Sequence, residues 1–153
     1  MDHSKKELYT AKRTSNLDVS NAELSEIWSR VKSDSSTENW VTYRVVDSRL
    51  VVCGSGCGGF EELLSSLNDD DVYFSCLRAL VDDKVKFISI YFVGENVNGI
   101  RKGKASLYKD SAFSVIESHC EIAVMDGKNC FTKDFFISEI RRVLKQNSAN
   151  IVV

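Results

Sequence analysis

Two neighbouring segments of this chain are apolar at both alternating sets of positions, and this pattern constrains the fold most. Residues 72–81 (VYFSCLRALV) and 85–93 (VKFISIYFV) are rich in β-branched and aromatic residues, which favour strands. A strand that is apolar on both sides needs a covering layer on each face of its sheet. The two segments, joined by Asp82, Asp83 and Lys84, therefore predict a central hairpin inside a three-layer sandwich.

Three further strands complete the predicted sheet. Residues 40–46 and 49–53 are β-branched and aromatic runs joined by Asp47 and Ser48, which is the pattern of a β-hairpin. Residues 119–124 form another strand candidate. The prediction is an α/β fold, a three-layer sandwich whose central five-stranded, mostly antiparallel (mixed) sheet carries helices on both faces.

The helices that cover this sheet are predicted from apolar residues at helical spacing. A first helix follows Ser20, which we expect to cap it with Glu23 at the third helical position. Short and long helices are predicted after Phe60 and Ile100, and a last one from Thr132 to about Lys145.

Length and composition indicate one domain. The chain has 153 residues, of which 43% are hydrophobic, enough for a single core. We expect a flexible extension over 1–18, the domain over 19–147 and a tail over 148–153. No apolar run reaches the roughly 18 residues of a membrane span, so we expect a cytosolic protein with no membrane segment. The net charge of −2 gives no indication of nucleic-acid binding.

The five cysteines do not form a recognisable framework. Their number is odd and no CxxC pair occurs among them, so we expect reduced, mostly buried thiols. A zinc site is not indicated, because Cys53 and Cys57 have no second Cys or His pair at ligand spacing. The cysteines are Cys53, Cys57, Cys76, Cys120 and Cys130.

One glycine-rich segment raises the possibility of a nucleotide-binding enzyme. Residues 54–59 (GSGCGG) match the pattern GxGxxG between a strand and a helix. The preceding strand lies in a predicted antiparallel hairpin, however, whereas dinucleotide-binding folds use a parallel crossover. A tight strand-to-helix connection is the favoured interpretation, and nucleotide binding remains the alternative.

No catalytic or metal-binding constellation emerges from the remaining residues. His119 has no nearby nucleophile and is interpreted as a half-buried core histidine. The run Asp69, Asp70 and Asp71 lacks further oxygen ligands at EF-hand spacing, so a solvated turn is favoured over a cation site. We predict no enzymatic activity, no cofactor and no metal.

The charges are unevenly distributed along the chain. Residues 47–83 contain eight acidic and two basic residues, a net −6, whereas residues 84–109 contain six basic and one acidic residue, a net +5. A basic surface can attract an acidic partner, although a solvated charged face is the plainer interpretation. The basic residues are Lys84, Lys86, Arg101, Lys102, Lys104 and Lys109.

Several segments resemble the actin-depolymerising-factor (ADF) homology family, in particular its coactosin and drebrin-type members. Residues 86–99 (KFISIYFVGENVNG) are similar to the family's strand and its Gly-Glu-Asn-Val turn, and this is the most specific match. Residues 40–43 (WVTY) and 135–140 (FFISEI) resemble coactosin segments, and residues 54–64 resemble the glycine-rich loop of the drebrin type. The resemblance runs from about Ser20 to Asn147.

This resemblance implies an actin-filament side-binding protein of the coactosin type with the ADF-homology fold, no catalysis and little severing or monomer binding. Lys86, Lys104 and Lys109 match filament-contacting positions. Arg101 and Lys102 are second-rank candidates, followed by Lys84 and by Arg141 and Arg142. We expect a monomer that associates with filamentous actin at the cytoskeleton.

The chain departs from the family pattern at two places. Phe92 stands where relatives usually have Trp, and the near-terminal serine of depolymerising members cannot be mapped onto Ser4. The alternatives are therefore an ADF/cofilin-like depolymerising role and a regulator of the actin branch-nucleating complex, as in relatives of the glia maturation factor type.

Overall fold

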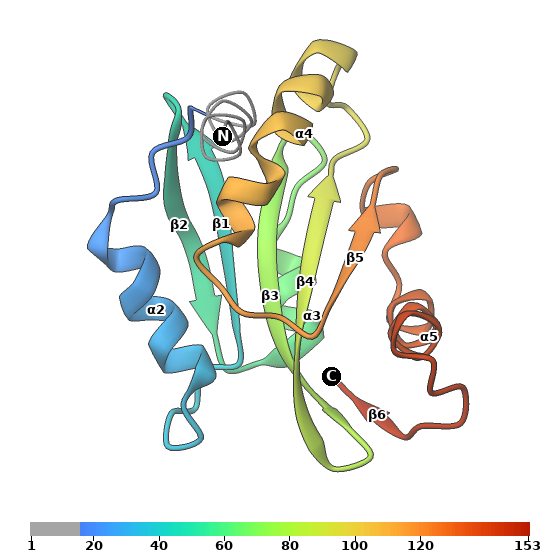
Figure 1. Cartoon of the computed structure of the whole chain (residues 1–153). Helices are drawn as coiled ribbons and strands as arrows, with labels where there is room; N and C mark the ends of the chain where they lie inside the picture. The colour runs from blue at the N-terminus through green and yellow to red at the C-terminus, as the bar shows by residue number, and fades with distance from the viewer. Residues whose placement is uncertain (1–15) are drawn as a thin grey trace, which may run out of the picture.

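The computed structural model describes residues 16–153. Its centre is a mixed sheet in which the strands follow the order β2-β1-β3-β4-β5 (Figure 1). All these neighbours are antiparallel except β4 and β5, which are parallel. The predicted five-stranded mixed sheet is confirmed, with strands β1 (Trp40–Val46), β2 (Arg49–Gly56), β3 (Val72–Val81), β4 (Lys84–Val93) and β5 (Cys120–Val124).

A sixth, two-residue strand was not predicted. Strand β6 (Ile151–Val152) pairs with β3 at Leu80 and Val81. The segment that contains it was interpreted as a tail, because two residues are too few to show a strand period. Asp18, placed in the predicted extension, pairs with Arg49 at the start of β2. Residues 1–15 of that extension lie outside the described residues.

Both predicted hairpins form through two-residue turns with left-handed backbone. Asp47 and Ser48 have φ of 51° and 61°, and Asp82 and Asp83 have φ of 49° and 65°. Positive φ at both central residues matches the twist of the flanking strands, and Asp tolerates this conformation better than most residues.

Within residues 16–153, four α-helices cover the sheet, two on each face. Helices α2 (Ala22–Lys32) and α4 (Gly99–Phe113) pack on one face, and α3 (Gly59–Ser66) and α5 (Lys133–Leu144) on the other. Figure 1 shows α4 crossing the sheet in front of β3 while α3 lies behind. Strand β4 alternates accordingly, with Ile88 and Phe92 facing α3 and α5 and Tyr91 facing α2 and α4. The three-layer prediction is confirmed.

Several local predictions need correction. The first helix is capped by Asn21, whose side chain accepts a hydrogen bond from the Glu23 amide, because Ser20 instead donates to the Asp18 carboxylate. Thr132 caps α5 as predicted. Strand β2 continues to Gly56, further into the glycine-rich segment than predicted.

The predicted burial of polar and sulfur-containing side chains is also partly wrong. Cys53, Cys57 and Cys130 are exposed, and Cys76 is the one fully buried thiol among the described residues. His119 is exposed as well, and its Nδ1 accepts a hydrogen bond from the Phe87 amide at the start of the β4–β5 ladder. Residues 16–153 contain no helix long and apolar enough to cross a membrane.

Candidate functional site

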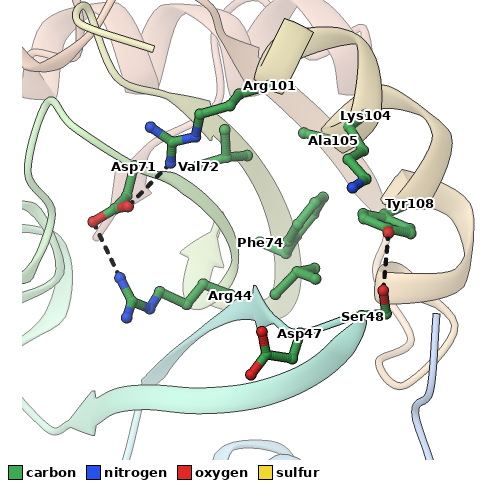
Figure 2. A pocket seen from close by; sticks show the side chains of 11 residues that line it. Arg44, Asp47, Ser48, Asp71, Val72, Phe74, Arg101, Lys104, Ala105 and Tyr108 are labelled. Atoms are coloured by element: carbon green, nitrogen blue, oxygen red, sulfur yellow. Dashed lines mark hydrogen bonds and ion pairs between the residues drawn. The ribbon is translucent and has the colours of Figure 1, made fainter. Parts of the chain in front are cut away.

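Helix α4 carries most of the predicted contact residues, and the structure distributes them over three sides of the helix. Lys104 is exposed and lies at the rim of a groove of about 410 Å³ between α4 and the turn that joins β1 to β2 (Figure 2). Its ammonium group makes no ion pair with any residue in the range 16–153. Lys104 therefore offers an uncompensated charge to a partner.

Lys102 and Lys109 lie on the opposite flank of α4, beside β5. The Lys109 ammonium donates to Glu121 Oε2 at 2.8 Å and lies 5.8 Å from the centre of the Tyr91 ring. The hydrogen bond to Glu121 raises the pKa of Lys109. Lys102 borders a hollow with Glu95 and Asp126. A partner that uses Lys109 must compete with Glu121, so Lys109 offers less free charge than Lys104.

Between these two flanks, the outward side of α4 exposes large apolar side chains. Ile100 is 84% exposed and Leu107 is 60% exposed. They are seven residues apart, two helical turns, so they share one side of the helix with Lys104 between them. We call Ile100, Lys104 and Leu107 the α4 stripe. Its apolar members were not among the predicted contact residues, although a helical projection of the sequence places them outside the buried face of the helix.

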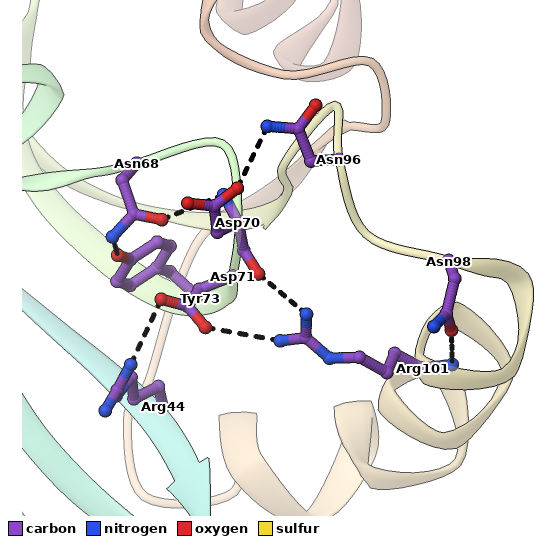
Figure 3. A network of polar contacts seen from close by, with 8 residues as sticks. All are labelled: Arg44, Asn68, Asp70, Asp71, Tyr73, Asn96, Asn98 and Arg101. Atoms are coloured by element: carbon purple, nitrogen blue, oxygen red, sulfur yellow. Dashed lines mark hydrogen bonds and ion pairs between the residues drawn. The ribbon is translucent and has the colours of Figure 1, made fainter.

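Arg101 is held by the protein itself. Its guanidinium donates to the Asp70 carbonyl at 2.7 Å and to Asp71 Oδ1 at 3.2 Å. Arg44 binds the second carboxylate oxygen of Asp71 at 3.1 Å. Figure 3 shows Asp71 between the two guanidinium groups. Arg101, a predicted contact residue, therefore connects the first turn of α4 to the start of β3 and, through Asp71, to β1.

The acidic run at 69–71 organises the end of the sheet from which α4 starts. The Asp69 carboxylate accepts a hydrogen bond from the Lys128 amide at 2.9 Å. The Asp70 carboxylate accepts one from the Asn96 side chain at 2.9 Å (Figure 3). The run forms a turn with an exposed Asp70, as predicted, but its carboxylates also bind distant parts of the chain. No group of three or more His, Cys, Asp or Glu residues suited to a metal occurs within 16–153.

The Gly-Glu-Asn-Val turn is shaped by contact with this acidic run. The Gly94 amide donates to the Asp71 carbonyl at 3.0 Å and the Asn96 amide to the Asp69 carbonyl at 2.8 Å. Val97 is buried beneath the turn. Asn98 then caps α4 by accepting a hydrogen bond from the Arg101 amide at 2.9 Å. These contacts fix where α4 begins and therefore where the α4 stripe points.

Lys84 and Lys86 are not brought together with α4. They lie on β4 beside the β3–β4 turn, at the opposite end of the sheet from the start of α4 (Figure 1). Lys86 shares the alternation of Ile88, which faces α3 and α5, so its side chain is on the face away from α4. The predicted residues thus form two separate surfaces.

Arg141 and Arg142 lie on α5 and both have partners. Arg141 Nε donates to the Ala149 carbonyl at 3.0 Å, and Arg142 forms a two-pronged contact with Glu139 at 2.8 and 3.0 Å. Arg141 therefore ties α5 to the segment that leads into β6.

The glycine-rich segment has a structural role. The Glu62 carboxylate accepts hydrogen bonds from Trp40 Nε1 at 2.7 Å and from the Gly58 amide at 3.1 Å. A Cβ atom on Gly56 or Gly58 would lie 2.8 or 2.9 Å from the Glu62 carboxyl carbon. The Gly59 amide donates to Asn39. Amides that would bind a phosphate are thus occupied by the protein's own side chains, and the strands before the loop are antiparallel.

Glu62 makes this loop sensitive to acid. The hydrogen bonds from Trp40 and then from Gly58 lower the pKa of Glu62 below its ordinary value of 4.5. A lowered pKa in the folded state means that the carboxylate stabilises the fold above that value, and that this contribution is lost as the pH falls through the folded-state pKa. We expect Glu62→Gln to lower the thermal midpoint at neutral pH and to reduce its further fall in acid.

Thermal unfolding followed by circular dichroism between about pH 7 and pH 3 measures both effects. Glu61→Gln is the matched control, because the Glu61 side chain is exposed and makes no hydrogen bond within the described residues. An unchanged acid profile in Glu62→Gln would show that the carboxylate does not hold the loop.

The order of the strands and the two layers of helices are those of the ADF-homology fold. The crystal structures of human coactosin-like protein superpose on the chain with a TM-score of 0.75 at 23% identity, covering 83% of this chain and 99% of that one. This likeness establishes the fold, and the predicted Gly-Glu-Asn-Val turn lies at the start of the long helix α4.

Sequence comparison identifies the family. The family model described as cofilin/tropomyosin-type actin-binding protein matches residues 16–141, and the chain belongs to this family. Coactosin of Dictyostelium discoideum is 32% identical over 107 residues, 66% of this chain and 73% of that protein. Coactosin-like protein of Homo sapiens is 26% identical over 116 residues, 73% of this chain and 81% of that protein. The predicted coactosin-type domain is confirmed.

Proposed function

We propose that this protein binds along the side of actin filaments and regulates them without catalysis, as a monomer in the cytoplasm. The observation that carries the proposal is the α4 stripe, where an unpaired Lys104 lies between two exposed apolar side chains in a chain of an actin-binding family. Apolar surface that is exposed along one side of a helix and bordered by polar residues is typical of protein-binding sites.

The stripe supplies two kinds of binding energy. Burying Ile100 and Leu107 against a partner contributes roughly 25 cal/mol per Å² of apolar surface removed from water. Lys104 adds charge complementarity, which chiefly increases the rate and the selectivity of association. The stripe thus favours a partner surface that is apolar at its centre and carboxylate-rich around it.

Lys84 and Lys86 form the second proposed contact surface. Neither ammonium group makes an ion pair within residues 16–153. Lys86 and Lys104 are therefore our first-rank contact residues. Lys109, Lys102 and Arg101 follow, since Lys109 and Arg101 have internal acidic partners. We further propose little severing or monomer binding. Ser4, which bears on that point, lies outside the described residues.

Co-sedimentation with polymerised actin tests the proposal. In dilute buffer we expect the protein to pellet with the filaments. At a salt concentration of about 0.3 M the bound fraction should fall clearly, because the Debye length shrinks to roughly 5–6 Å and exposed charge pairs are screened. The same protein centrifuged without actin is the control. Protein that stays in the supernatant in dilute buffer would contradict the proposed function.

A further inference from the structure

The groove beside Lys104 is a hollow that can hold a side chain, rather than a flat contact surface. It lies between α4 and the β1–β2 turn, and its volume is about 410 Å³. Phe74 and Ala105 contribute buried apolar atoms to its lining, while polar side chains from both elements stand around them (Figure 2). A group that enters this groove is therefore partly shielded from water, which strengthens electrostatic interactions there.

The charge of the groove favours an anion. Three cations line it, Arg44, Arg101 and Lys104, against the two acids Asp47 and Asp71. Asp71 is shared by the two arginines, which holds both guanidinium groups in place. Their side chains are still 42% and 48% exposed. Guanidinium N–H groups that do not face Asp71 therefore remain available as donors.

Two hydroxyl groups add neutral donors at the same place. The Ser48 and Tyr108 hydroxyls lie 3.4 Å apart and share one hydrogen bond (Figure 2). Each hydroxyl has one proton to donate, so the pair uses one proton between themselves and keeps the other free. A carboxylate, which accepts hydrogen bonds through both oxygens, matches this set of donors.

The groove is continuous with the α4 stripe, because Lys104 belongs to both. A protein that covers Ile100 and Leu107 also covers the opening beside Lys104, and a side chain on that protein can reach the Tyr108 hydroxyl one turn further along α4. We therefore expect the anion to belong to the protein that binds the α4 stripe, rather than to a separate small molecule.

We propose that the groove receives an acidic side chain of actin, whose carboxylate binds Lys104 and the Tyr108 hydroxyl, while Arg44 and Arg101, held at Asp71, attract it from the other side of the groove (Figure 2). The proposal rests on the proposed function. It adds Tyr108, as a contact residue, and Arg44, as a nearby positive charge, to the predicted set. It also gives Asp71 a role as a positioning residue, since its carboxylate holds the Arg44 and Arg101 side chains at the edge of the groove.

Two substitutions in the full-length protein test the groove. Arg44→Gln removes one cation, and Tyr108→Phe removes one hydroxyl while keeping the ring. In co-sedimentation we expect Tyr108→Phe to weaken filament binding by roughly threefold, as for loss of a hydrogen bond. Arg44→Gln should weaken it by a smaller factor, because the Arg44 charge acts on the carboxylate from a distance. The Arg44→Gln variant should also depend less on salt, because one positive charge that attracts the carboxylate is gone.

Arg49→Gln is the matched control, since it makes the same chemical change in the same hairpin. Leu50 packs towards α2 and α4, so the alternation of β2 points Arg49 to the other face, away from the groove. It should bind like the unmodified protein. Thermal midpoints check folding, and Tyr108→Phe serves as the decisive variant if Arg44→Gln is destabilised.

The possible outcomes separate the two proposals. Normal pelleting of both groove variants, together with weaker pelleting of Lys86→Glu, would overturn the groove proposal and leave filament binding in place. A wild-type protein that fails to pellet in dilute buffer would overturn both. Weaker binding of Tyr108→Phe with normal binding of Arg49→Gln supports the groove.

Discussion

Gly94→Ala is expected to destabilise the protein by about 3 kcal/mol or more, since overpacking of this kind usually costs 1–3 kcal/mol and hydrogen bonds are lost in addition. A Cβ atom on Gly94 would overlap the Asp69 backbone, with the Asp69 Cα only 2.7 Å away. Backbone cannot rotate aside as a flexible side chain can. The turn must therefore move, which breaks the bonds from Gly94 to Asp71 and from Asn96 to Asp69.

The expected decrease is a large part of the whole free energy of unfolding, because domains of this size have unfolding free energies of about 5–15 kcal/mol. Urea unfolding followed by fluorescence measures it. Gly103→Ala is the control, since no atom lies within 4 Å of a Cβ at this position inside α4. That variant should gain about 0.5–1 kcal/mol, because Ala is the better helix former. Equal stabilities of the two variants would contradict the packing argument.

The architecture could be predicted because its signals are local and repeated. Both faces of β3 and β4 are apolar at successive positions, so the need for helices on each side is visible within about ten residues. Turn and cap residues, such as Asp47 and Thr132, act on neighbours one to three positions away. These features depend on short-range geometry, which sequence spacing records directly.

The role of the acidic run could not be predicted, because its partners are distant in sequence. Asp69 binds the Lys128 amide, 59 positions away, and Asp71 binds Arg44, 27 positions away. The three aspartates therefore look the same as a solvated turn until the topology places those partners beside them. The pairing of Lys109 with Glu121 was missed for the same reason, since it requires β5 to lie next to α4.

The α4 stripe is a different case, because its information is local. The buried residues Ala105 and Ala112 define one side of α4, and Ile100 and Leu107 fall outside it on a helical projection. A set of candidates chosen by charge alone does not include Ile100 and Leu107. Charged candidates were found as a set by composition, but whether each charge is free or paired is decided by neighbours that only the fold supplies.

The double substitution Lys86→Glu and Lys104→Glu is expected to abolish pelleting with actin filaments. Each reversal removes an attraction to carboxylates and adds a repulsion, and juxtaposed like charges at an interface cost several kcal/mol. Because the two residues lie on separate surfaces at opposite ends of the sheet, their effects should add. The single variants should each retain part of the binding.

Folding should be unaffected, since neither ammonium group has an internal ion-pair partner in the described chain and surface changes of this kind stay within about 0.5 kcal/mol. Arg49→Glu with Lys133→Glu is the control. Each reversal lowers the net charge by two, so both double variants go from −2 to −6. Loss of pelleting in both would indicate dependence on net charge alone, whereas loss confined to the Lys86 and Lys104 variant assigns binding to these two surfaces.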